Sequence, residues 1–506
     1  MLARLADLPF IVLLTGISGL AMLVPAMHGL AVNDHATAQA FFYWSILFLV
    51  LFAMIALATS NYSIRRQGRS HLISILMTFT LLPVMLAVPF NEAVPNTIFL
   101  NAYVEMVSSL TTTGLTLFEP DRLPPTVHLW RAFVGWLGGF FVWVTAISVM
   151  APLNLGGYEV SSSREVGSGA TISTAQIDRV ADASERLMRF SVRFAPIYGG
   201  LTAALWIALL IAGDTPLVSF CHAMSTMATS GISPVGGDSG GGSGIVGEAL
   251  VMIFLVFALS RVTFSAYERP DGWHSLVRDP ELRLGLLIIV SLSTLLFFRH
   301  FGATFEEGLA VSAYEGLMGL WGALFTVTSF LTTAGFESEH WATARAWSGL
   351  GSPGVLLLGL AVFGGGVATT AGGVKLLRVY ALYKHGMREM EKLVLPSSIG
   401  GAGQAARRFR RQGAYVAWVF FMLFAISIAV VTLALSLVAH VDFEEAMILT
   451  IATLSTTGPL TEVAGDMPVN LAQLNDAAKA ILSAAMILGR LETLAIIALL
   501  NPEFWR

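Results

Sequence analysis

Ten apolar segments, each close to the length of a membrane-spanning helix, divide this chain and dictate the solvent in which it can fold. They cover approximately residues 9–31, 40–60, 72–90, 128–153, 191–213, 245–264, 282–300, 352–374, 414–438 and 477–500. A bilayer core about 30 Å thick needs ~20 apolar residues in one helix. Because 55% of the residues are hydrophobic and only 12% are charged, a soluble core could not bury them all. We therefore predict an all-α polytopic membrane protein with ten transmembrane helices.

The basic residues predict which side of the membrane each connection occupies. Of the 29 Lys and Arg residues, 23 lie at the chain ends or in the connections around 65–69, 154–193, 261–283 and 375–411. An excess of positive charge marks cytoplasmic connections. The opposite connections are acidic, with Glu92 and Glu337 as examples. We predict a multi-pass protein of a bacterial inner membrane with both termini in the cytoplasm.

Charge and cysteine content exclude several function classes. The formal net charge of −4 excludes a nucleic-acid binder that works through bulk positive charge. The one cysteine, Cys221, excludes an intrachain disulfide framework and a multi-cysteine metal site. The sequence has no phosphate-binding loop or dinucleotide fingerprint, so we do not expect an enzyme or an ATPase. Gly237 to Gly241 imitates a serine-protease motif, and we interpret that match as coincidence in a helical chain.

Four outer connections share a pattern that suggests an internal repeat. Each contains a short apolar piece, too short to span the bilayer, that ends in Thr, a small residue, Gly and an apolar residue. The four turns are Thr112-Thr113-Gly114-Leu115, Thr229-Ser230-Gly231-Ile232, Thr333-Ala334-Gly335-Phe336 and Thr456-Thr457-Gly458-Pro459. Successive glycines are 117, 104 and 123 residues apart. We predict a unit of span, re-entrant helix, turn and span that occurs four times.

The chemistry of these turns is suited to a dehydrated monovalent cation. Irregular backbone at membrane depth is tolerated where it lines a watery path. Backbone carbonyls that point into such a path can replace the hydration shell of an ion. Glycine permits a positive φ, threonine adds a hydroxyl oxygen, and each re-entrant helix aims its partly negative C-terminus inward. Four turns would form a pseudo-fourfold ring of oxygens.

At these residues the chain resembles the TrkH/KtrB group of the potassium transporter superfamily. Further motifs that carry the resemblance are Leu82-Pro83, Pro89-Phe90, Trp136-Leu137-Gly138-Gly139, Gly364 to Lys375, Leu488 to Glu492, and Asn501 to Arg506. The resemblance covers residues ~72–506 and implies four M1–pore helix–M2 repeats around one pore, preceded by two leading helices. The expected boundaries are 1–71 for the leading pair and 72–160, 161–270, 271–400 and 401–506 for the repeats.

The resemblance also implies roles for the turns and for a loop. The sixteen turn residues become a K⁺ filter, with the ion at Thr112, Thr113, Thr229, Ser230, Thr333, Ala334, Thr456 and Thr457. Four glycines in the filter favour K⁺ over Na⁺. The glycine-rich stretch with Gly364, Gly365, Gly366, Thr369, Thr370, Gly372 and Gly373 resembles an intramembrane loop that closes the pore. Close packing of a helix through small residues is the alternative.

Two cations call for separate interpretation: Arg490 in the middle of a predicted span and Lys375 at the end of the glycine-rich stretch. Arg490 lies within segment 477–500, where a charge is costly and usually functional, so we expect it to face the pore as a barrier. A structural pair with Glu492 is the alternative, although residues two apart point in different directions on a helix. Lys375 belongs to the gate motif, but we interpret it as a residue that reaches the cytoplasmic edge rather than as a pore charge.

The predicted function is therefore K⁺ uptake, with K⁺ as the transported ion and no organic cofactor. The resemblance implies a homodimer and a separate TrkA-type nucleotide-binding ring in the cytoplasm, for which the basic 375–411 segment is the expected contact. A K⁺/Na⁺-permeable symporter of the same family and a broken-helix transporter for an organic solute are the alternatives. The sequence leaves open whether flux is passive or coupled to H⁺ or Na⁺.

Overall fold

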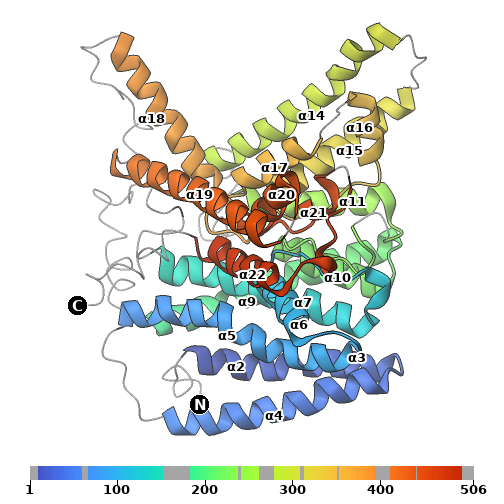
Figure 1. Cartoon of the computed structure of the whole chain (residues 1–506), viewed down its shortest axis with the longest axis vertical. Coiled ribbons are helices and arrows are strands. Elements are labelled where there is room, and N and C mark those ends of the chain that lie inside the picture. Colours follow the sequence, from blue (N-terminus) through green and yellow to red (C-terminus); the bar gives the residue numbers. More distant parts are fainter. Residues whose placement is uncertain are drawn as a thin grey trace.

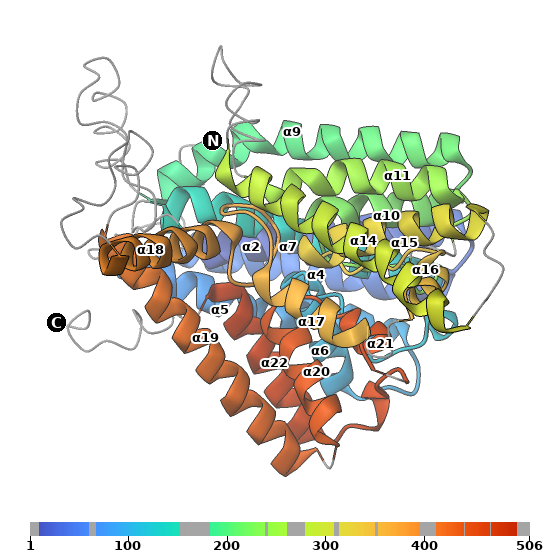
Figure 2. The ribbon, with the colours of Figure 1, turned by 90° about the horizontal axis from the view of Figure 1, so that it is seen from above.

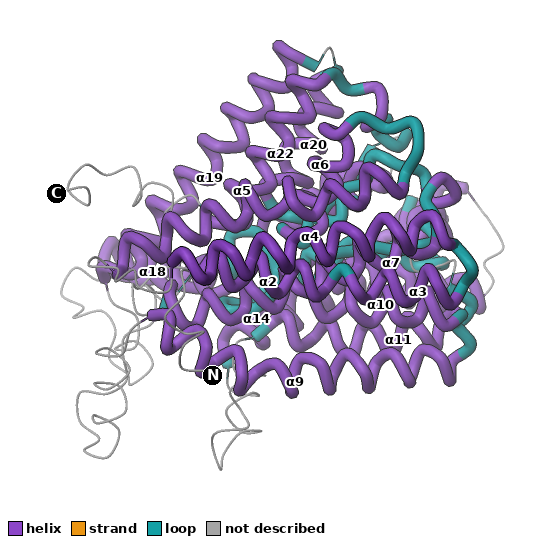
Figure 3. The backbone as a smooth tube through the Cα atoms, turned by 90° about the horizontal axis from the view of Figure 1, so that it is seen from below, coloured by secondary structure: helices purple, strands orange, loops and turns teal. Residues whose placement is uncertain are grey.

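The described part of the chain is helical. The computed structural model describes residues 10–59, 67–151, 157, 183–237, 241–260, 279–307, 313–349, 353–394, 411–439, 441–465 and 467–492. These residues form helices joined by loops, with no strand among them (Figure 3). Seven helices within these ranges are long and apolar enough to cross a membrane: Ile11–Ala31, His35–Thr59, Ile73–Ala93, Pro125–Met150, Arg186–Ala212, Pro280–Arg299 and Gly413–Val438. The predicted class of an all-α polytopic membrane protein is confirmed.

Two leading helical segments precede the repeats. The first predicted span consists of α2 (Phe10–Ala21) and α3 (Leu23–Ala31) in direct succession, and the second span is α4 (His35–Thr59). Ser45 of α4 donates a 2.7 Å hydrogen bond to the Gly19 carbonyl of α2, which satisfies a buried hydroxyl between the two helices. α4 lies along one edge of the molecule and leaves much of its surface uncovered (Figure 1). This arrangement suits a helix that faces lipid.

The remaining helices follow the predicted order in each of the four units: a long helix, a shorter helix before the turn, and a further helix after the turn. The first long helices are α5 (Gln67–Ala93), α9 (Ala183–Ala212), α14 (Pro280–Glu307) and α19 (Arg411–Val438). The short helices before the turns are α6 (Phe99–Leu110), α10 (Pro216–Ala228), α15 (Ala313–Leu331) and α20 (Phe443–Leu454). The helices at the places of the second predicted spans are α7 (Pro125–Thr145), α11 (Gly244–Leu255), α17 (Pro353–Phe363) and α22 (Asp476–Leu491). α15 is longer than the dozen residues expected.

Shorter helical pieces complete the units. They are η1 (Pro120–Arg122), the π-helical η2 (Ala146–Met150) that continues α7, η4 (Val256–Leu259) after α11, α16 (Trp341–Ser348), α18 (Leu376–Val394), α21 (Leu460–Val463) and η7 (Leu471–Gln473). α18 and α14 diverge from each other at one edge of the molecule (Figure 1).

Proline marks the beginnings of several helices, because its missing N–H costs nothing in the first turn. Pro125 opens α7 and Pro216 opens α10. α22 begins differently: Asn475 caps it by accepting a 2.8 Å hydrogen bond from the Ala478 N–H. Asn475 also donates to the Val438 carbonyl at 2.6 Å, which attaches the start of α22 to the end of α19.

The four units close into a ring around their short helices. α6 packs against α7 of its own unit and against α22 of the fourth, and α10 packs against both α9 and α7. α9 and α11 therefore lie at one edge of the bundle and α19 at the other, with the short helices between them (Figure 2). Contact between the first and fourth units places the four turns around one axis.

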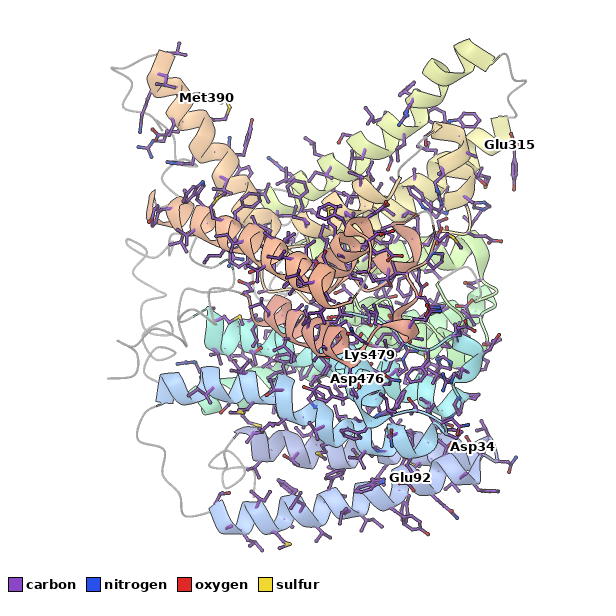
Figure 4. The ribbon with its side chains drawn as sticks, viewed as in Figure 1. Asp34, Glu92, Glu315, Met390, Asp476 and Lys479 are labelled. Atoms are coloured by element: carbon purple, nitrogen blue, oxygen red, sulfur yellow. The ribbon has the colours of Figure 1, made fainter. Side chains whose placement is uncertain are left out.

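Three predicted spans appear as shorter helices among the described residues. Segments 245–264, 352–374 and 477–500 correspond to α11 with η4, to α17, and to α22. α17 ends at Phe363, and residues 493–500 lie outside the described ranges. The count of ten spans and the four repeat boundaries stay predictions. Asp34 in the first connection and Glu315 of α15 lie on the right side of the molecule in Figure 4, and Met390 of the basic α18 lies on the left side.

Candidate functional site

The four turns share one backbone conformation. In the first, the Thr112 N–H donates to Ser109 O at 2.9 Å and the Thr113 N–H donates to Ser108 O at 2.8 Å. This pair of bonds defines a Schellman motif at the end of α6. The same pair of bonds recurs at the ends of α10, α15 and α20. The second bond of each pair runs from a backbone N–H to a carbonyl oxygen: Ser230 N–H to Ser225 O at 2.9 Å, Ala334 N–H to Ser329 O at 2.9 Å, and Thr457 N–H to Ala452 O at 2.8 Å. The internal repeat is therefore visible in the hydrogen bonds.

Each motif has a threonine in the left-handed position that glycine usually occupies. The φ angles are 54° for Thr112, 49° for Thr229, 58° for Thr333 and 54° for Thr456. A β-branched residue at positive φ is an outlier that costs about 1–3 kcal/mol and typically marks a functional site. Sequence analysis missed this strain, although a threonine at the same place in all four turns was the available signal.

A glycine lies two residues after each left-handed threonine. In the first two turns it is required because the neighbouring turn comes too close for a Cβ. A Cβ on Gly114, whose φ is 73°, would lie 1.8 Å from the Ser230 carbonyl oxygen. A Cβ on Gly231 would lie 2.3 Å from the Ala334 carbonyl oxygen. The first turn thus abuts the second, and the second abuts the third. No side chain larger than hydrogen fits at either contact.

The fourth turn differs from the other three. Gly114, Gly231 and Gly335 have positive φ, whereas Gly458 does not. Pro459 follows Gly458 and disfavours helical conformations in the residue before it. The Gly458 N–H donates a 2.6 Å hydrogen bond to the Thr113 carbonyl, which joins the fourth turn to the first. The structure thus brings all four predicted turns together.

A cavity of about 60 Å³ lies on the side of the turns toward which the chain continues after each glycine. This volume has room for a few water molecules. Its walls come from all four units and include Gly114, Gly231, Gly335 and Pro459. Glu337, Glu462 and Arg131 supply charge to the lining.

Burial raises the pKa of both cavity carboxyls. Desolvation is the main cause at Glu337, where Glu462 raises the pKa further and Arg345 opposes the shift. Desolvation also raises the pKa of Glu462, against the effect of Arg131. Two carboxylates that face one small cavity favour cations over anions there.

The glycine-rich segment after α17 is a loop rather than a helix. Residues 364–375 connect α17 to α18, and the loop makes contacts with the second and third turns. The Gly372 N–H donates to Thr333 Oγ1 at 2.7 Å, and Thr370 Oγ1 lies 3.1 Å from Thr229 Oγ1. The partners belong to the ends of the short helices, so the loop and the cavity lie on opposite sides of the turns.

The loop divides the four threonine hydroxyls into two pairs. Those of Thr229 and Thr333 bond to the loop, whereas Thr112 Oγ1 and Thr456 Oγ1 are buried without a hydrogen-bond partner among the described residues. A buried hydroxyl without a hydrogen-bond partner is costly. These two hydroxyls are therefore suited to bind a water molecule or an ion. Gly372 approaches the fourth turn so closely that a Cβ there would lie 2.2 Å from Thr456 Oγ1.

Charged side chains hold the other face of the loop. Glu281 of α14 accepts a 2.9 Å hydrogen bond from the Val367 N–H, and the Gly366 N–H donates to Ala258 O at 2.9 Å. Lys375 donates to the Ala371 carbonyl and is 7% exposed. The interpretation of Lys375 as a residue that reaches the cytoplasmic edge is therefore wrong: its ammonium group turns back into the loop.

Arg490 is buried in the last turn of α22. It is 6% exposed, and its Nε and Nη2 have no hydrogen-bond partner among the described residues. Glu492 does not pair with it; Glu492 accepts from Arg378 at 2.6 Å, and the Arg378 guanidinium stacks 3.7 Å from the centre of the Phe420 ring. The structural pair considered as the alternative is thus replaced by a bond between α22 and α18.

Comparison with known proteins gives a consistent result. A family model described as TrkH, cation transport protein, matches residues 37–504. The chain belongs to the TrkH family of cation transport proteins. A Trk system potassium uptake protein TrkH from Vibrio parahaemolyticus is 30% identical over 502 residues, with 98% of each chain covered. The protein of the same name from Escherichia coli K12 is 30% identical over 497 residues, with 96% of each chain covered. The crystal structure of the potassium transporter TrkH from Vibrio parahaemolyticus superposes with a TM-score of 0.81 at 26% identity over the whole of both chains.

Other sequence signals of this TrkH-family chain have structural explanations. His222 bonds to Ser233 at 2.9 Å within the second unit, and Cys221 is fully buried beside it. Residues 238–240 of the protease-like motif lie outside the described ranges, as do 395–410 of the basic segment and Asn501 to Arg506. As a member of a transport family, the chain is a multi-pass membrane protein.

Proposed function

We propose that this chain is a potassium uptake subunit in which K⁺ passes through the ring of four turns. The observation that carries the proposal is the shared Schellman backbone of the turns, which gives four units the same strained threonine around one axis. The relatives named for potassium uptake support the choice of ion. Glycine in all four turns favours K⁺ over Na⁺, and a K⁺/Na⁺-permeable symporter is the second candidate.

K⁺ enters from the acidic cavity and reaches oxygens of the turns. Glu337 and Glu462 raise the local cation concentration, and turn oxygens then replace water around the ion. The hydroxyls of Thr112 and Thr456 suit this task, because they have no hydrogen-bond partner among the described residues and lose no bond by turning to a cation. Thr113, Ser230, Ala334 and Thr457, the other residues at which the ion is predicted, each come directly after a strained threonine in the sequence.

The loop of residues 364–375 and Arg490 form the gate. The loop occupies the hydroxyls of Thr229 and Thr333, so its withdrawal would free them for the ion. Arg490 brings a buried positive charge to the inner side, where it opposes a cation. The broken-helix transporter requires inverted halves, whereas four units here repeat in the same order of helices.

The assembly consists of two copies of this chain in a bacterial inner membrane, with termini in the cytoplasm, and a TrkA-type nucleotide-binding ring. The basic 375–411 segment is the proposed contact for the ring. Its first part is α18, in which Arg378 is buried and Lys384, Arg388 and Lys392 are available for the contact.

Flux through liposomes tests the function directly. The purified chain is reconstituted, and uptake of K⁺, Rb⁺ and Na⁺ is measured at a set voltage. We expect K⁺ and Rb⁺ to enter faster than Na⁺. Equal entry of K⁺ and Na⁺ would favour the second candidate, and no entry of any of them, together with no rescue of growth in low potassium, would refute transport of alkali cations.

A further inference from the structure

One position of the short helices is fully buried in all four units. It lies nine residues before the glycine of each turn and holds Glu105, His222, Thr326 and Leu449, each with an exposed fraction of 0%. Three of these four side chains are polar. A buried polar group at this depth is costly unless it has a partner, so each of the three calls for an explanation.

All three polar side chains bond to the segment that leaves their own turn. Glu105 Oε2 accepts a 3.1 Å hydrogen bond from the Leu117 N–H. Thr326 Oγ1 accepts a 3.3 Å hydrogen bond from the Ser338 N–H. These two bonds connect equivalent residues in the first and third units, because Leu117 and Ser338 each lie three residues after the glycine.

The bond in the second unit connects two side chains. His222 Nε2 and Ser233 Oγ are 2.9 Å apart. Because Ser233 gives its single hydroxyl proton to the Gly237 carbonyl at 2.6 Å, His222 Nε2 is the donor. Ser233 lies two residues after Gly231, close to the place that Leu117 and Ser338 occupy.

The residues fixed by these bonds form or adjoin the wall of the cavity. Thr116 and Phe118, on either side of Leu117, line it, as does Ser233 itself. Glu337, directly before Ser338, lines it from the third unit. The three bonds therefore determine where the outer wall of the ion pathway lies.

Charged residues from neighbouring elements support each bond. Arg131 of α7 lies 2.6 Å from Glu105, and Asp214 lies 3.9 Å from His222 Nδ1. Glu248 of α11 accepts from Ser338 Oγ at 2.9 Å and from the Glu339 N–H at 2.7 Å, and so links the second unit to the third. A residue that only filled space would not need such support.

The fourth unit shows what replaces the bond where it is missing. Leu449 has no polar atom to offer. Thr461, three residues after Gly458, instead bonds within its own turn: its N–H donates to Gly458 O at 3.0 Å and its Oγ1 donates to the same oxygen at 2.9 Å. In the fourth unit, the segment after the turn is thus fixed by bonds from α21 to the turn itself. In the other units, that segment is fixed by a side chain of the helix before the turn.

We propose that Glu105, His222 and Thr326 are positioning residues that set the spacing of the outer wall and thereby the discrimination among alkali cations. The proposal rests on the function proposed above and deepens it. None of the three needs to touch the ion: each acts through the segment to which it bonds.

The test measures permeability ratios in liposomes for His222→Leu and Thr326→Val, which remove the bonds. Loss of one buried hydrogen bond corresponds to roughly a 3- to 10-fold change in an equilibrium, and we expect the Na⁺/K⁺ or Rb⁺/K⁺ ratio to change by that order. His222→Gln, which retains an amide donor, should move the ratio back toward the unmodified value. Leu449→Ile alters the equivalent position where no bond exists, and should leave the ratio within about twofold.

A ratio does not depend on how much protein is active, so partial loss of folded protein does not disturb the result. Should His222→Leu not fold, Thr326→Val decides, because it removes a hydroxyl at nearly constant volume. Unchanged ratios in the bond-removing variants, with normal K⁺ flux in the unmodified chain, would overturn the positioning role alone. Absence of K⁺ flux in the unmodified chain would instead refute the proposed function.

Discussion

Arg490 presents a charge where a cation pathway is least able to accept one. It is buried, and its Nε and Nη2 have no hydrogen-bond partner among the described residues. We expect Arg490→Ala to raise cation flux at least about fivefold, equivalent to about 1 kcal/mol in the barrier. Arg490→Lys keeps the charge and serves as the control that should stay near the original rate. Flux that is unchanged or reduced in Arg490→Ala liposomes would remove this role.

We expect Glu337 and Glu462 to make uptake sensitive to the pH on the cavity side of the turns. Desolvation raises the pKa of both carboxyls, so they lose their charge at a higher pH than an ordinary glutamate as the solution is acidified. Protonation removes the negative potential of the cavity, and we expect K⁺ influx to fall as the pH decreases through the raised pKa values.

The check on this pH dependence is a titration of influx in which only the outer pH varies. The double variant Glu337→Gln and Glu462→Gln should show lower influx at neutral pH and a flatter profile. A profile that keeps its full slope in the double variant would assign the titration to other groups.

For single residues, the sequence predicted which residues form the turns better than it predicted their conformation and contacts. The sixteen turn residues were found because threonine and glycine recur at fixed places. The left-handed φ of Thr112 and its counterparts was not found, because threonine has no intrinsic preference for that conformation. Lys375 was misplaced because a lysine next to an apolar segment normally extends to water, whereas here its ammonium group bonds to Ala371 O.

The loop between α17 and α18 offers a paired test at the level of an element. Thr370 bonds to Thr229 Oγ1 at 3.1 Å and to Met227 O at 3.3 Å, both outside the loop. Among the described residues, the hydroxyl of Thr369 bonds only within the loop, to Gly366 O at 2.8 Å. We expect Thr370→Val to weaken the attachment by about 1 kcal/mol and to raise flux several-fold. Thr369→Val is the matched control. Equal effects of the two substitutions on K⁺ flux would show that attachment to the second turn does not hold the loop closed.

Close contact between α7 and the end of α6 gives a prediction about stability. A Cβ on Gly138 would lie 2.1 Å from the Leu110 carbonyl oxygen. Backbone cannot move as easily as a flexible side chain, so we expect Gly138→Ala to reduce the free energy of unfolding by about 1–3 kcal/mol. Gly199 of α9 has open space around it and provides the control. Thermal unfolding in detergent should show a lower Tm for Gly138→Ala and no loss for Gly199→Ala. An undiminished Tm for Gly138→Ala would contradict the contact.

Elements were predicted well where one physical requirement dominates. Seven segments are long enough in the structure to span a bilayer, because apolar length alone determines that property. The break after Phe363 was expected from the family resemblance, because its glycines alone left a closely packed helix as an equal alternative. The subdivision of the first span into α2 and α3 was not expected, because Met22 carries no signal of a helix end.

At the scale of the whole molecule, the proposed regulatory ring should depend on the basic segment after α18. Deletion of residues 400–411 removes four arginines, Arg407, Arg408, Arg410 and Arg411. We expect this deletion to abolish co-purification with a TrkA-type ring and to leave K⁺ flux of the isolated chain unchanged. Replacement of the four by lysine keeps the charge and should retain binding. Full co-purification of the deleted chain would place the contact elsewhere.

The sequence by itself determined that this chain lies in a membrane, that it repeats one unit four times, and which residues form the turns. Apolar length and residue spacing are local properties, and a single chain displays them directly. Only the tertiary structure decided that the turns abut, that the loop occupies the hydroxyls of Thr229 and Thr333, and that Glu492 pairs with Arg378 rather than with Arg490. These contacts join residues far apart in the sequence, such as Thr229 and Thr370, or Thr113 and Gly458. Their geometry follows from how the four units close into a ring, which no local pattern encodes.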